Sequence, residues 1–279
     1  MLEEPAAPRR PPLVIRSLPP RRVVAGVATV LAFAIVGLLL GGVLGGRSRL
    51  PQMAGASSSR AEVRFDAHRA HAPHPKGESV IVRARHRSIV VYRSRHGSRR
   101  RSRAVHGLVV EGHRIPLVLL QISRRGDWLH VRLPGRPNGS TGWVRRRDVT
   151  IATTTLRVVV QLRRHRLELR DRGRVVLRRR IAVGRSLSPT PAGRYFLVDI
   201  LAPPDPHGFY GPYALGLSAY STVYTTFAGG DGQVGIHGTN QASKIGTDVS
   251  HGCIRVDNAT ITRLAKRLPL GTPVDIRRG

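Results

Sequence analysis

Residues 236–240 read Ile-His-Gly-Thr-Asn, and residues 250–255 read Ser-His-Gly-Cys-Ile-Arg. The two segments contain two His-Gly pairs and Cys253, the single cysteine of the 279-residue chain. A thiol reacts as its thiolate, and a nearby histidine is the usual means of forming one. Gly252 lets the backbone turn tightly beside the sulfur and expose amide N–H groups that can hold an oxyanion. The pattern therefore predicts nucleophilic chemistry at Cys253.

The two histidines stand at different distances from the cysteine. His251 is two residues away, and in an extended segment side chains at this spacing point to the same face. His237 depends on the fold to approach the sulfur. Other interpretations stay open: buried structural residues, a serine mechanism at Ser250 without its usual elbow motif, or a zinc site. The spacing of His237, His251 and Cys253 matches no common zinc pattern.

A β-rich domain is predicted over residues 153–279. Short β-branched runs alternate with turn residues, and residues 171–173, Asp-Arg-Gly, are typical of a hairpin turn. One helix is expected over residues 258–267, with Asp257 as its N-cap and its apolar side chains on one face. A last short strand is expected at residues 273–277.

The segment from His237 to Arg255 resembles the signature of the L,D-transpeptidase catalytic (YkuD) family. That signature is a His-Gly pair, a loop, then Ser/Thr-His-Gly-Cys followed by an apolar residue and Arg or Asn. Residues 189–195, Pro-Thr-Pro-Ala-Gly-Arg-Tyr, and 211–218, Gly-Pro-Tyr-Ala-Leu-Gly-Leu-Ser, resemble two further blocks of the family. The resemblance covers residues 153–279 and implies a β-rich catalytic domain.

The resemblance also implies a cysteine acyl-enzyme. Cys253 matches the nucleophile, and His237 matches the base, oriented through its other ring nitrogen by the backbone carbonyl of Gly238. In the family the thiol attacks a peptidoglycan stem tetrapeptide at the carbonyl before the terminal D-Ala. The acyl group then passes to the side-chain amine of a second stem. No metal or other cofactor is implied.

The remaining expected site residues surround this pair. Backbone N–H groups of three consecutive residues are expected to hold the oxyanion: His251, Gly252 and Cys253. Ser250 and Arg255 occupy positions that shape the pocket. Three residues are expected contacts in the substrate cleft: Tyr210, Tyr213 and Asn240. Tyrosine in a Gly- and Pro-rich segment is also a common packing residue.

Two rival functions stay open. In an L,D-carboxypeptidase of the same fold, water would replace the acceptor amine, and the motifs do not define the acceptor side of the cleft. In a non-catalytic wall-binding protein, the arginine-rich surface and the preceding module would matter instead. The complete set of His237 and Cys253 argues against the second rival.

A small SH3-like β-barrel is predicted over residues 79–150. Short β-branched and aromatic runs are separated there by Gly, Pro, Asn and Arg clusters. Residues 128–131, Trp-Leu-His-Val, and 142–144, Gly-Trp-Val, resemble the closing strands of bacterial SH3-like modules. Residues 47–78 before it are predicted to be a linker.

One transmembrane helix is predicted over residues 23–46, which contain no charged side chain. About 20 apolar residues span a bilayer core, more than a secretory signal usually supplies. More arginines precede the segment than follow it, which predicts a cytoplasmic tail at residues 1–22. We therefore expect a single-pass protein of the cell membrane, with its catalytic domain in the periplasm or cell wall.

The net charge of +31 predicts attraction to polyanions. Of the 47 basic residues, three are lysines and the rest are arginines. Charge alone does not choose among nucleic acid, anionic lipid and anionic wall polymers. The predicted export across the membrane disfavours nucleic acid, so we expect anionic wall polymers or a lipid surface as the possible polyanionic partners.

Overall fold

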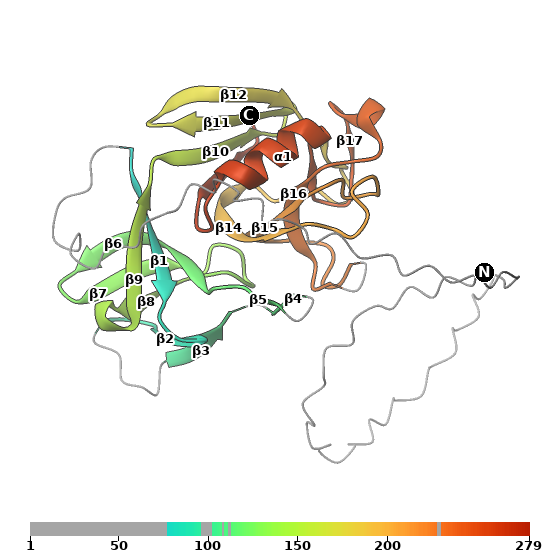
Figure 1. Cartoon of the computed structure of the whole chain (residues 1–279). Helices are drawn as coiled ribbons and strands as arrows, with labels where there is room; N and C mark the ends of the chain where they lie inside the picture. Colours follow the sequence, from blue (N-terminus) through green and yellow to red (C-terminus); the bar gives the residue numbers. More distant parts are fainter. Residues whose placement is uncertain (1–76, 96–101, 108, 111–112, 228–229) are drawn as a thin grey trace, which may run out of the picture. The chain divides into compact units, whose positions relative to one another are not determined.

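The computed structural model describes residues 77–95, 102–107, 109–110, 113–227 and 230–279. These residues form two large β-sheets, two two-stranded sheets and one α-helix, so the predicted mainly β fold with a short helix is confirmed (Figure 1). The predicted tail and membrane helix lie outside the described residues, as does almost all of the linker. Within the described part, no helix has the length and apolar character needed to cross a membrane.

The first large sheet is antiparallel, with the strand order β3-β2-β8-β7-β6-β1-β9. Its strands are β1 (Ser79–Ala84), β2 (Ser88–Tyr92), β3 (Ser102–His106), β6 (Val118–Arg125), β7 (Trp128–Arg132), β8 (Thr141–Arg145) and β9 (Val149–Thr154). The short 3-10 helix η3 (Arg146–Asp148) precedes β9, while β4 (Val109–Val110) pairs with β5 (His113–Arg114). β9 runs past the expected boundary at residue 150, because it pairs with β1 as far as Thr154. The likeness to an SH3-like barrel stays a prediction.

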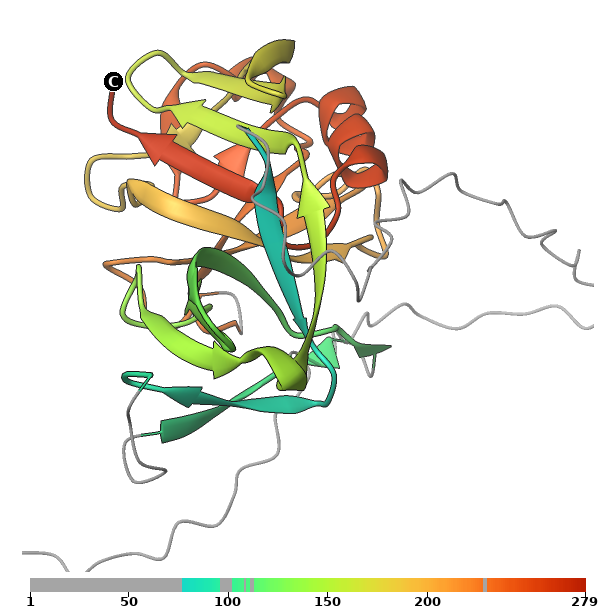
Figure 2. The same ribbon diagram turned by 90° about the vertical axis from the view of Figure 1, so that its left-hand side faces the viewer.

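Strand β1 is buried on both faces. Val80 and Val82 belong to the core of the first sheet, whereas Ile81, between them, packs in a cluster with Phe196 and Val198 of the second sheet. Successive side chains of a strand point to opposite faces, so one strand can serve two cores. The two sheets therefore share apolar packing. Figures 1 and 2 show β9 leading directly into β10.

The second large sheet carries the predicted catalytic motifs. Its strand order is β12-β11-β10-β19-β14-β15-β16-β18. The strands are β10 (Leu156–Gln161), β11 (Arg166–Asp171), β12 (Arg174–Arg180), β14 (Gly193–Leu201), β15 (Ala214–Tyr220), β16 (Gln233–His237), β18 (Ile254–Arg255) and β19 (Pro273–Arg277). The predicted hairpin turn at residues 171–173 is confirmed between β11 and β12. β13 (Val183–Gly184) and β17 (Asp248–Ser250) form a small parallel pair, and η4 (Ala242–Lys244) is a 3-10 turn.

Helix α1 (Asn258–Arg267) has the predicted bounds. Asp257 caps it, because its Oδ1 accepts a hydrogen bond from the Thr260 amide at 2.8 Å and its Oδ2 accepts one from the Thr260 hydroxyl at 2.7 Å. Ile261 and Leu264 are fully buried in the main core of the second sheet. The helix thus fixes the position of its first residue, Asn258, beside the end of β16.

Candidate active site

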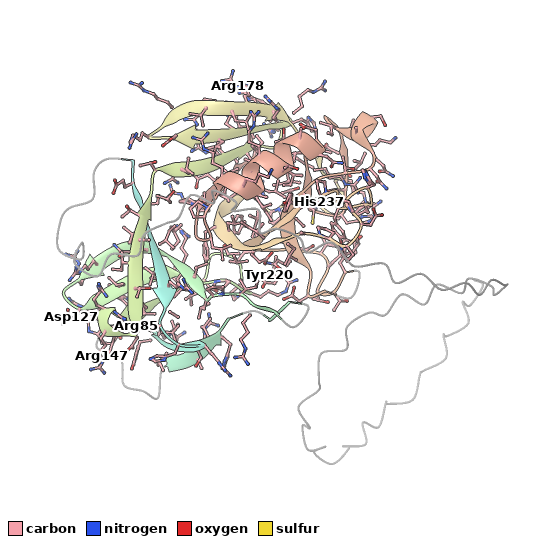
Figure 3. All side chains as sticks on the ribbon, in the orientation of Figure 1. Arg85, Asp127, Arg147, Arg178, Tyr220 and His237 are labelled. Carbon is pink, nitrogen blue, oxygen red and sulfur yellow. The ribbon has the colours of Figure 1, made fainter. Side chains whose placement is uncertain are left out.

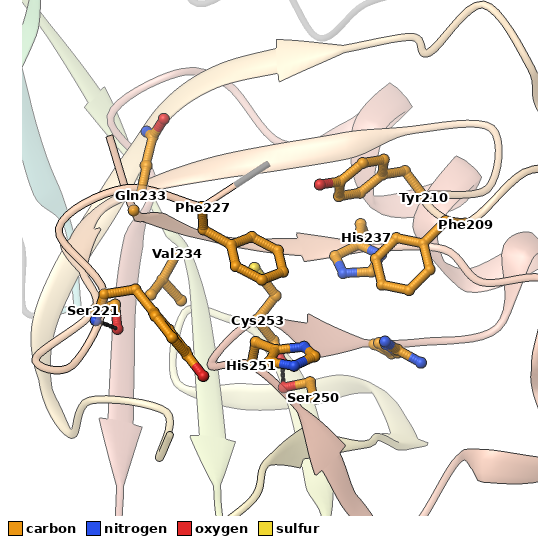
Figure 4. A pocket seen from close by; sticks show the side chains of 13 residues that line it. Phe209, Tyr210, Ser221, Phe227, Gln233, Val234, His237, Ser250, His251 and Cys253 are labelled. Carbon is orange, nitrogen blue, oxygen red and sulfur yellow. Dashed lines mark hydrogen bonds between the residues drawn. The ribbon is translucent and has the colours of Figure 1, made fainter. Parts of the chain in front are cut away.

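Strand pairing brings the two sequence motifs together. β16 and β18 run parallel, with Ile236 opposite Ile254 and His237 opposite Arg255. Cys253 directly precedes β18, so its side chain lies next to the strand that carries the histidine. Figure 4 shows Cys253 and His237 facing the same pocket, whereas Figure 3 labels Arg178 on the outer edge strand β12. The two motifs are separated in the sequence, and strand pairing in the sheet brings them together.

His237 is held in one tautomer. Its side chain is 2% exposed, and its Nδ1 lies 2.6 Å from the backbone oxygen of Gly238. A carbonyl oxygen accepts a hydrogen bond and does not donate one, so Nδ1 carries the proton and Nε2 is free to accept one. Burial lowers the pKa of His237 to about 4, with Arg255 contributing in the same direction. The imidazole is therefore neutral at physiological pH and can act as a base.

Cys253 is a protonated thiol at rest. Burial raises the pKa of the Cys253 thiol, while a backbone hydrogen bond from Gly235 and the charge of Arg255 act in the opposite direction. A neutral thiol and a neutral imidazole in the same pocket imply that the proton moves as the sulfur attacks, rather than before substrate binds. The groups that favour the thiolate are already in place around the sulfur.

Ser250 organises the backbone of the cysteine loop. Its hydroxyl donates to the carbonyl oxygen of Cys253 at 2.5 Å and accepts from the amide of Gly252 at 3.1 Å. Gly252 has φ of +123°, a conformation open to glycine and strained for other residues. Of the three amides expected to hold the oxyanion, that of Gly252 is bonded to Ser250 in this structure. The amides of His251 and Cys253 are therefore the preferred candidates, and the assignment of oxyanion donors stays a prediction.

Arg255 is a buried cation at the side of the pocket. It is 4% exposed, its Nη1 donates to Oε1 of Gln241 at 3.0 Å, and its Cζ lies 4.5 Å from the centroid of the Phe209 ring. Its buried Nε has no hydrogen-bond partner among the described residues. Burial lowers the pKa of Arg255, and Cys253 and Tyr210 raise it. This charge can stabilise the thiolate and a substrate oxygen.

His251 faces a different part of the pocket. The segment that joins β15 to β16 is called the strap below, and it is described at residues 221–227 and 230–232. Two aromatic rings of the strap lie close to the His251 ring. The ring centroid of His251 lies 5.0 Å from that of Phe227 and 6.0 Å from that of Tyr224. Burial and the charges of Arg185 and Arg255 lower the pKa of His251. Its side chain thus belongs to the wall of the pocket.

The pocket encloses about 410 Å³ of space, including its open mouth. Its exposed walls are largely apolar, and His237, His251 and Cys253 all line it (Figure 4). Among the described residues, no three His, Cys, Asp or Glu side chains gather into a group able to hold a metal ion. The arrangement suits acyl transfer by the thiol to and from a substrate that enters beside the aromatic rings.

The three residues expected to contact substrate in the cleft lie in different places. Tyr210 lines the pocket, with its ring centroid 5.0 Å from that of His237. Tyr213 packs against the main core, and its carbonyl accepts a hydrogen bond from Gly238. Asn240 is exposed and is not among the residues that line the pocket. Tyr213 therefore packs on the core side of the strand that carries His237 and is hydrogen-bonded to the residue that follows it.

Several residues in and next to the pocket were not predicted from the sequence. The Phe209 ring lies beside that of His237, tilted by 32° and with ring centroids 5.7 Å apart, and its position next to Tyr210 was an available signal. Tyr224 and Phe227 lie on the strap, where no motif marks them. Asn258 was expected only as the start of the helix, yet its Oδ1 accepts from the Thr239 amide at 2.8 Å. A Cβ on Gly238 would lie 2.4 Å from the same Oδ1 atom, so this approach requires glycine.

Comparisons with known proteins agree on the second sheet. The family model described as YkuD, L,D-transpeptidase catalytic domain, matches residues 155–276. The YkuD protein of Bacillus licheniformis is 40% identical over 124 residues, which are 44% of this chain and 67% of that protein. YkuD of Bacillus subtilis is 35% identical over 126 residues, 45% of this chain and 68% of that protein.

Solved structures show a partial likeness. The structure of Bd1075 from Bdellovibrio bacteriovorus has a TM-score of 0.37 and 23% identity, covering 44% of this chain and 48% of that chain. L,D-transpeptidase 3 from Mycobacterium tuberculosis has a TM-score of 0.38 and 14% identity, covering 58% of this chain and 91% of that chain.

Proposed function

The chain belongs to the YkuD family of L,D-transpeptidase catalytic domains, and from this premise we propose that it forms peptidoglycan cross-links through an acyl-enzyme on Cys253. One observation carries the proposal. Nδ1 of His237 is bonded to the Gly238 carbonyl, which leaves Nε2 unprotonated in the pocket that holds the Cys253 thiol. An unprotonated ring nitrogen that shares a pocket with a thiol supports a role for His237 as its general base.

In the first half of the proposed reaction, the Cys253 sulfur attacks the carbonyl carbon before the terminal D-Ala of a stem tetrapeptide. The thiol proton passes to Nε2 of His237. The carbonyl oxygen becomes an oxyanion, for which backbone amides of His251 and Cys253 are the expected donors. When the amide bond breaks, the imidazolium returns the proton to the departing D-Ala amine, and a thioester remains on Cys253.

In the second half, the side-chain amine of another stem peptide attacks the thioester. His237 takes a proton from this amine, and the thiolate regains a proton as the carbon–sulfur bond breaks. One amide is consumed and one is formed, so the exchange needs no ATP. The same thioester could be hydrolysed by water, which would make the enzyme an L,D-carboxypeptidase. The acceptor decides between the two outcomes.

The rest of the chain is proposed to place this chemistry at the wall. Residues 23–46 anchor the chain in the cell membrane, and the SH3-like module and the arginines contact anionic wall polymers or the lipid surface. Protease added to intact spheroplasts should then digest the catalytic domain. Protection of the domain until lysis would contradict this orientation.

Intact-protein mass spectrometry tests the chemistry. Incubation with a carbapenem should add one covalent adduct to the wild-type chain, because a β-lactam presents an activated amide carbonyl to the thiol. Cys253→Ser should remain unmodified at the same concentration. A folded wild-type protein that forms neither this adduct nor a thioester with a stem tetrapeptide would falsify the proposal and favour a non-catalytic wall-binding role.

Analysis of the products separates the two enzyme outcomes. With a stem tetrapeptide alone and an acceptor amine present, the transpeptidase should release D-Ala and form a peptide dimer. A carboxypeptidase should release D-Ala and accumulate the tripeptide whatever amine is added. Dimer formation that depends on Cys253 supports the proposed function, and tripeptide as the single product supports the alternative.

A further inference from the structure

The strap contributes one wall of the candidate active site. Its Tyr224 and Phe227 line the pocket and contact the ring of His251, two residues from the nucleophile. Its ends are joined by a hydrogen bond from the Ser221 amide to the Gly232 carbonyl at 2.8 Å. Between these ends, Thr222, Val223 and Thr225 are exposed.

Within the strap, the Ser221 hydroxyl accepts hydrogen bonds from the Val223 and Tyr224 amides at 3.2 and 3.0 Å. Phe227 and Gly230 exchange backbone hydrogen bonds, and the Tyr224 and Phe227 rings lie 5.7 Å apart. These contacts shape the strap, but they do not join it to the first sheet.

Further contacts to the strap come from the first sheet. Arg136, in the loop between β7 and β8, donates to the carbonyl oxygens of three residues around the strap: Ser221 at 2.8 Å, Tyr224 at 2.8 Å and Asp231 at 3.0 Å. Its Cζ also lies 5.0 Å from the centroid of the Tyr220 ring. One guanidinium thus joins both ends of the strap and the residue that carries an active-site ring.

A second residue of the same loop strengthens this connection. The side chain of Asn138 donates to the Tyr220 carbonyl at 2.7 Å and accepts from the Tyr220 amide at 2.8 Å. Tyr220, labelled in Figure 3, is the last residue of β15, immediately before the strap. Asn138 therefore holds the strand end from which the strap begins.

The chemistry of the contact requires an arginine and a glycine. A guanidinium presents several N–H donors in one plane and can reach separate carbonyls, whereas an ammonium is a compact point charge. Gly232 has φ of +75°, and a Cβ there would lie 2.8 Å from Nη2 of Arg136 and 2.4 Å from the Tyr224 oxygen. Gly232 thus leaves the space that the Arg136 side chain occupies.

We propose that Arg136 is a positioning residue of the active site, through which the first sheet holds the strap and its Tyr224 and Phe227 rings beside Cys253. This rests on the proposed function for its consequence, since the rings shape the cleft for the stem peptide. The first sheet would then be required for efficient acyl transfer in addition to any contact that it makes with the wall.

The test uses the full chain with Arg136→Ala, Arg136→Lys and the control Arg125→Ala, an exposed arginine of the same sheet. Arg136→Ala should lower kcat/KM for a stem tetrapeptide about 10- to 100-fold, the size of effect that a misplaced contact can have. Arg136→Lys should restore a small part of the loss. The control should match the wild type.

Two further measurements separate positioning from general loss of structure. Hydrogen exchange of the strap amides, Val223 and Tyr224 among them, should become faster in Arg136→Ala while the strands of both sheets keep their protection. Alkylation of Cys253 by iodoacetamide should become faster as well, because the strap covers the sulfur less. If Arg136→Ala merely made the protein unstable, amides throughout the structure would lose protection. Asn138→Ala would then provide a milder variant for the same measurements.

Each outcome has one meaning. Wild-type exchange, alkylation and kcat/KM in Arg136→Ala would overturn the proposal, as would full rescue by Arg136→Lys. If the wild-type chain turns over no stem peptide, the proposed function fails, and the exchange and alkylation measurements still decide whether Arg136 positions the strap.

Discussion

At the scale of single residues, burial sets the state of the catalytic pair. Burial lowers the pKa of His237 and raises the pKa of the Cys253 thiol, so both groups rest neutral. The hydrogen bond from Nδ1 to Gly238 then decides which ring nitrogen accepts the proton. The two histidines of the motifs differ in their contacts. The described ring contacts of His251 are with Tyr224 and Phe227 of the strap, and not with Gly238.

Three substitutions should therefore fall in a clear order. Cys253→Ser should abolish acyl transfer, because a hydroxyl is much harder to ionise than a thiol. His237→Ala should lower the rate about 10²- to 10⁴-fold through loss of the general base. His251→Ala should cost less, since it keeps the backbone N–H. Rates on a stem tetrapeptide measure this order, and an inactive His251→Ala beside an active His237→Ala would reverse the two assignments.

The pKa of about 4 for His237 predicts an acid-tolerant enzyme. Acylation should persist as pH falls through the ordinary histidine range and decline as His237 becomes protonated near about pH 4. The unfolded chain binds this proton below about pH 6.5 and the native protein does not. The contribution of His237 to stability should therefore be full above pH 6.5 and decrease as pH falls toward about 4.

NMR titration of the His237 ring measures this pKa directly. Urea unfolding at a series of pH values, compared between the wild type and His237→Ala, isolates the stability contribution of the ring. A His237 ring that titrates near 6.5 in the folded protein would contradict the neutral resting state.

At the scale of elements, the site depends on a strand pair and a helix. The parallel pairing of β16 with β18 sets His237 beside the cysteine loop. Helix α1 places Asn258 against the turn that follows β16, where the Asn258 Oδ1 accepts a hydrogen bond from the Thr239 amide. The cap at Asp257 and the buried face of α1 keep that helix end in position. A substitution of Asp257 should therefore disturb the active site by displacing Asn258.

Asp257→Ala should lower the free energy of unfolding by about 1 kcal/mol, the usual cost of removing an N-cap. It should also lower turnover modestly, as the Asn258 contact loosens. Asp257→Asn is the matched control, because its amide oxygen can still accept from the Thr260 amide. Denaturant unfolding and kcat report the two effects, and equal stability of the alanine and asparagine variants would show that the cap is unimportant.

At the scale of the whole molecule, the two large sheets are joined by apolar packing and by the strap contacts. Phe196 is fully buried in the shared cluster with Ile81 and Leu120 of the first sheet. Both tryptophans of the chain, Trp128 and Trp143, lie in the first sheet, whereas Cys253 lies in the second. Fluorescence and thiol reactivity therefore report the two sheets separately.

Phe196→Ala should destabilise the protein by about 3–5 kcal/mol through loss of buried contacts and a residual cavity. Because the cluster is shared, the denaturation midpoints from tryptophan fluorescence and from Cys253 reactivity should both fall. Val176→Ala, at a side chain that is 44% exposed, should leave both midpoints nearly unchanged. A fluorescence midpoint that stays at the wild-type value in Phe196→Ala would show that the two sheets unfold independently.

The sequence by itself determined the features that local chemistry controls. The bounds of α1 followed from a cap and an apolar face within ten residues, and the hairpin turn at residues 171–173 followed from its turn residues. The family resemblance implied the nucleophile, the base and the Gly238 contact, and the Nδ1 hydrogen bond has the geometry of that contact. These signals lie within a few residues of the feature that they specify.

Only the tertiary structure decided the contacts between distant segments. Sheet order set His237 beside the cysteine loop and turned Tyr213 toward the core, and loop packing placed His251 under Phe227. Arg136 reaches residues more than 80 positions away, and nothing in its neighbouring sequence marks that role. Side-chain spacing specifies which face of a strand or helix is buried, but the partner of that face is chosen by the packing of the whole chain.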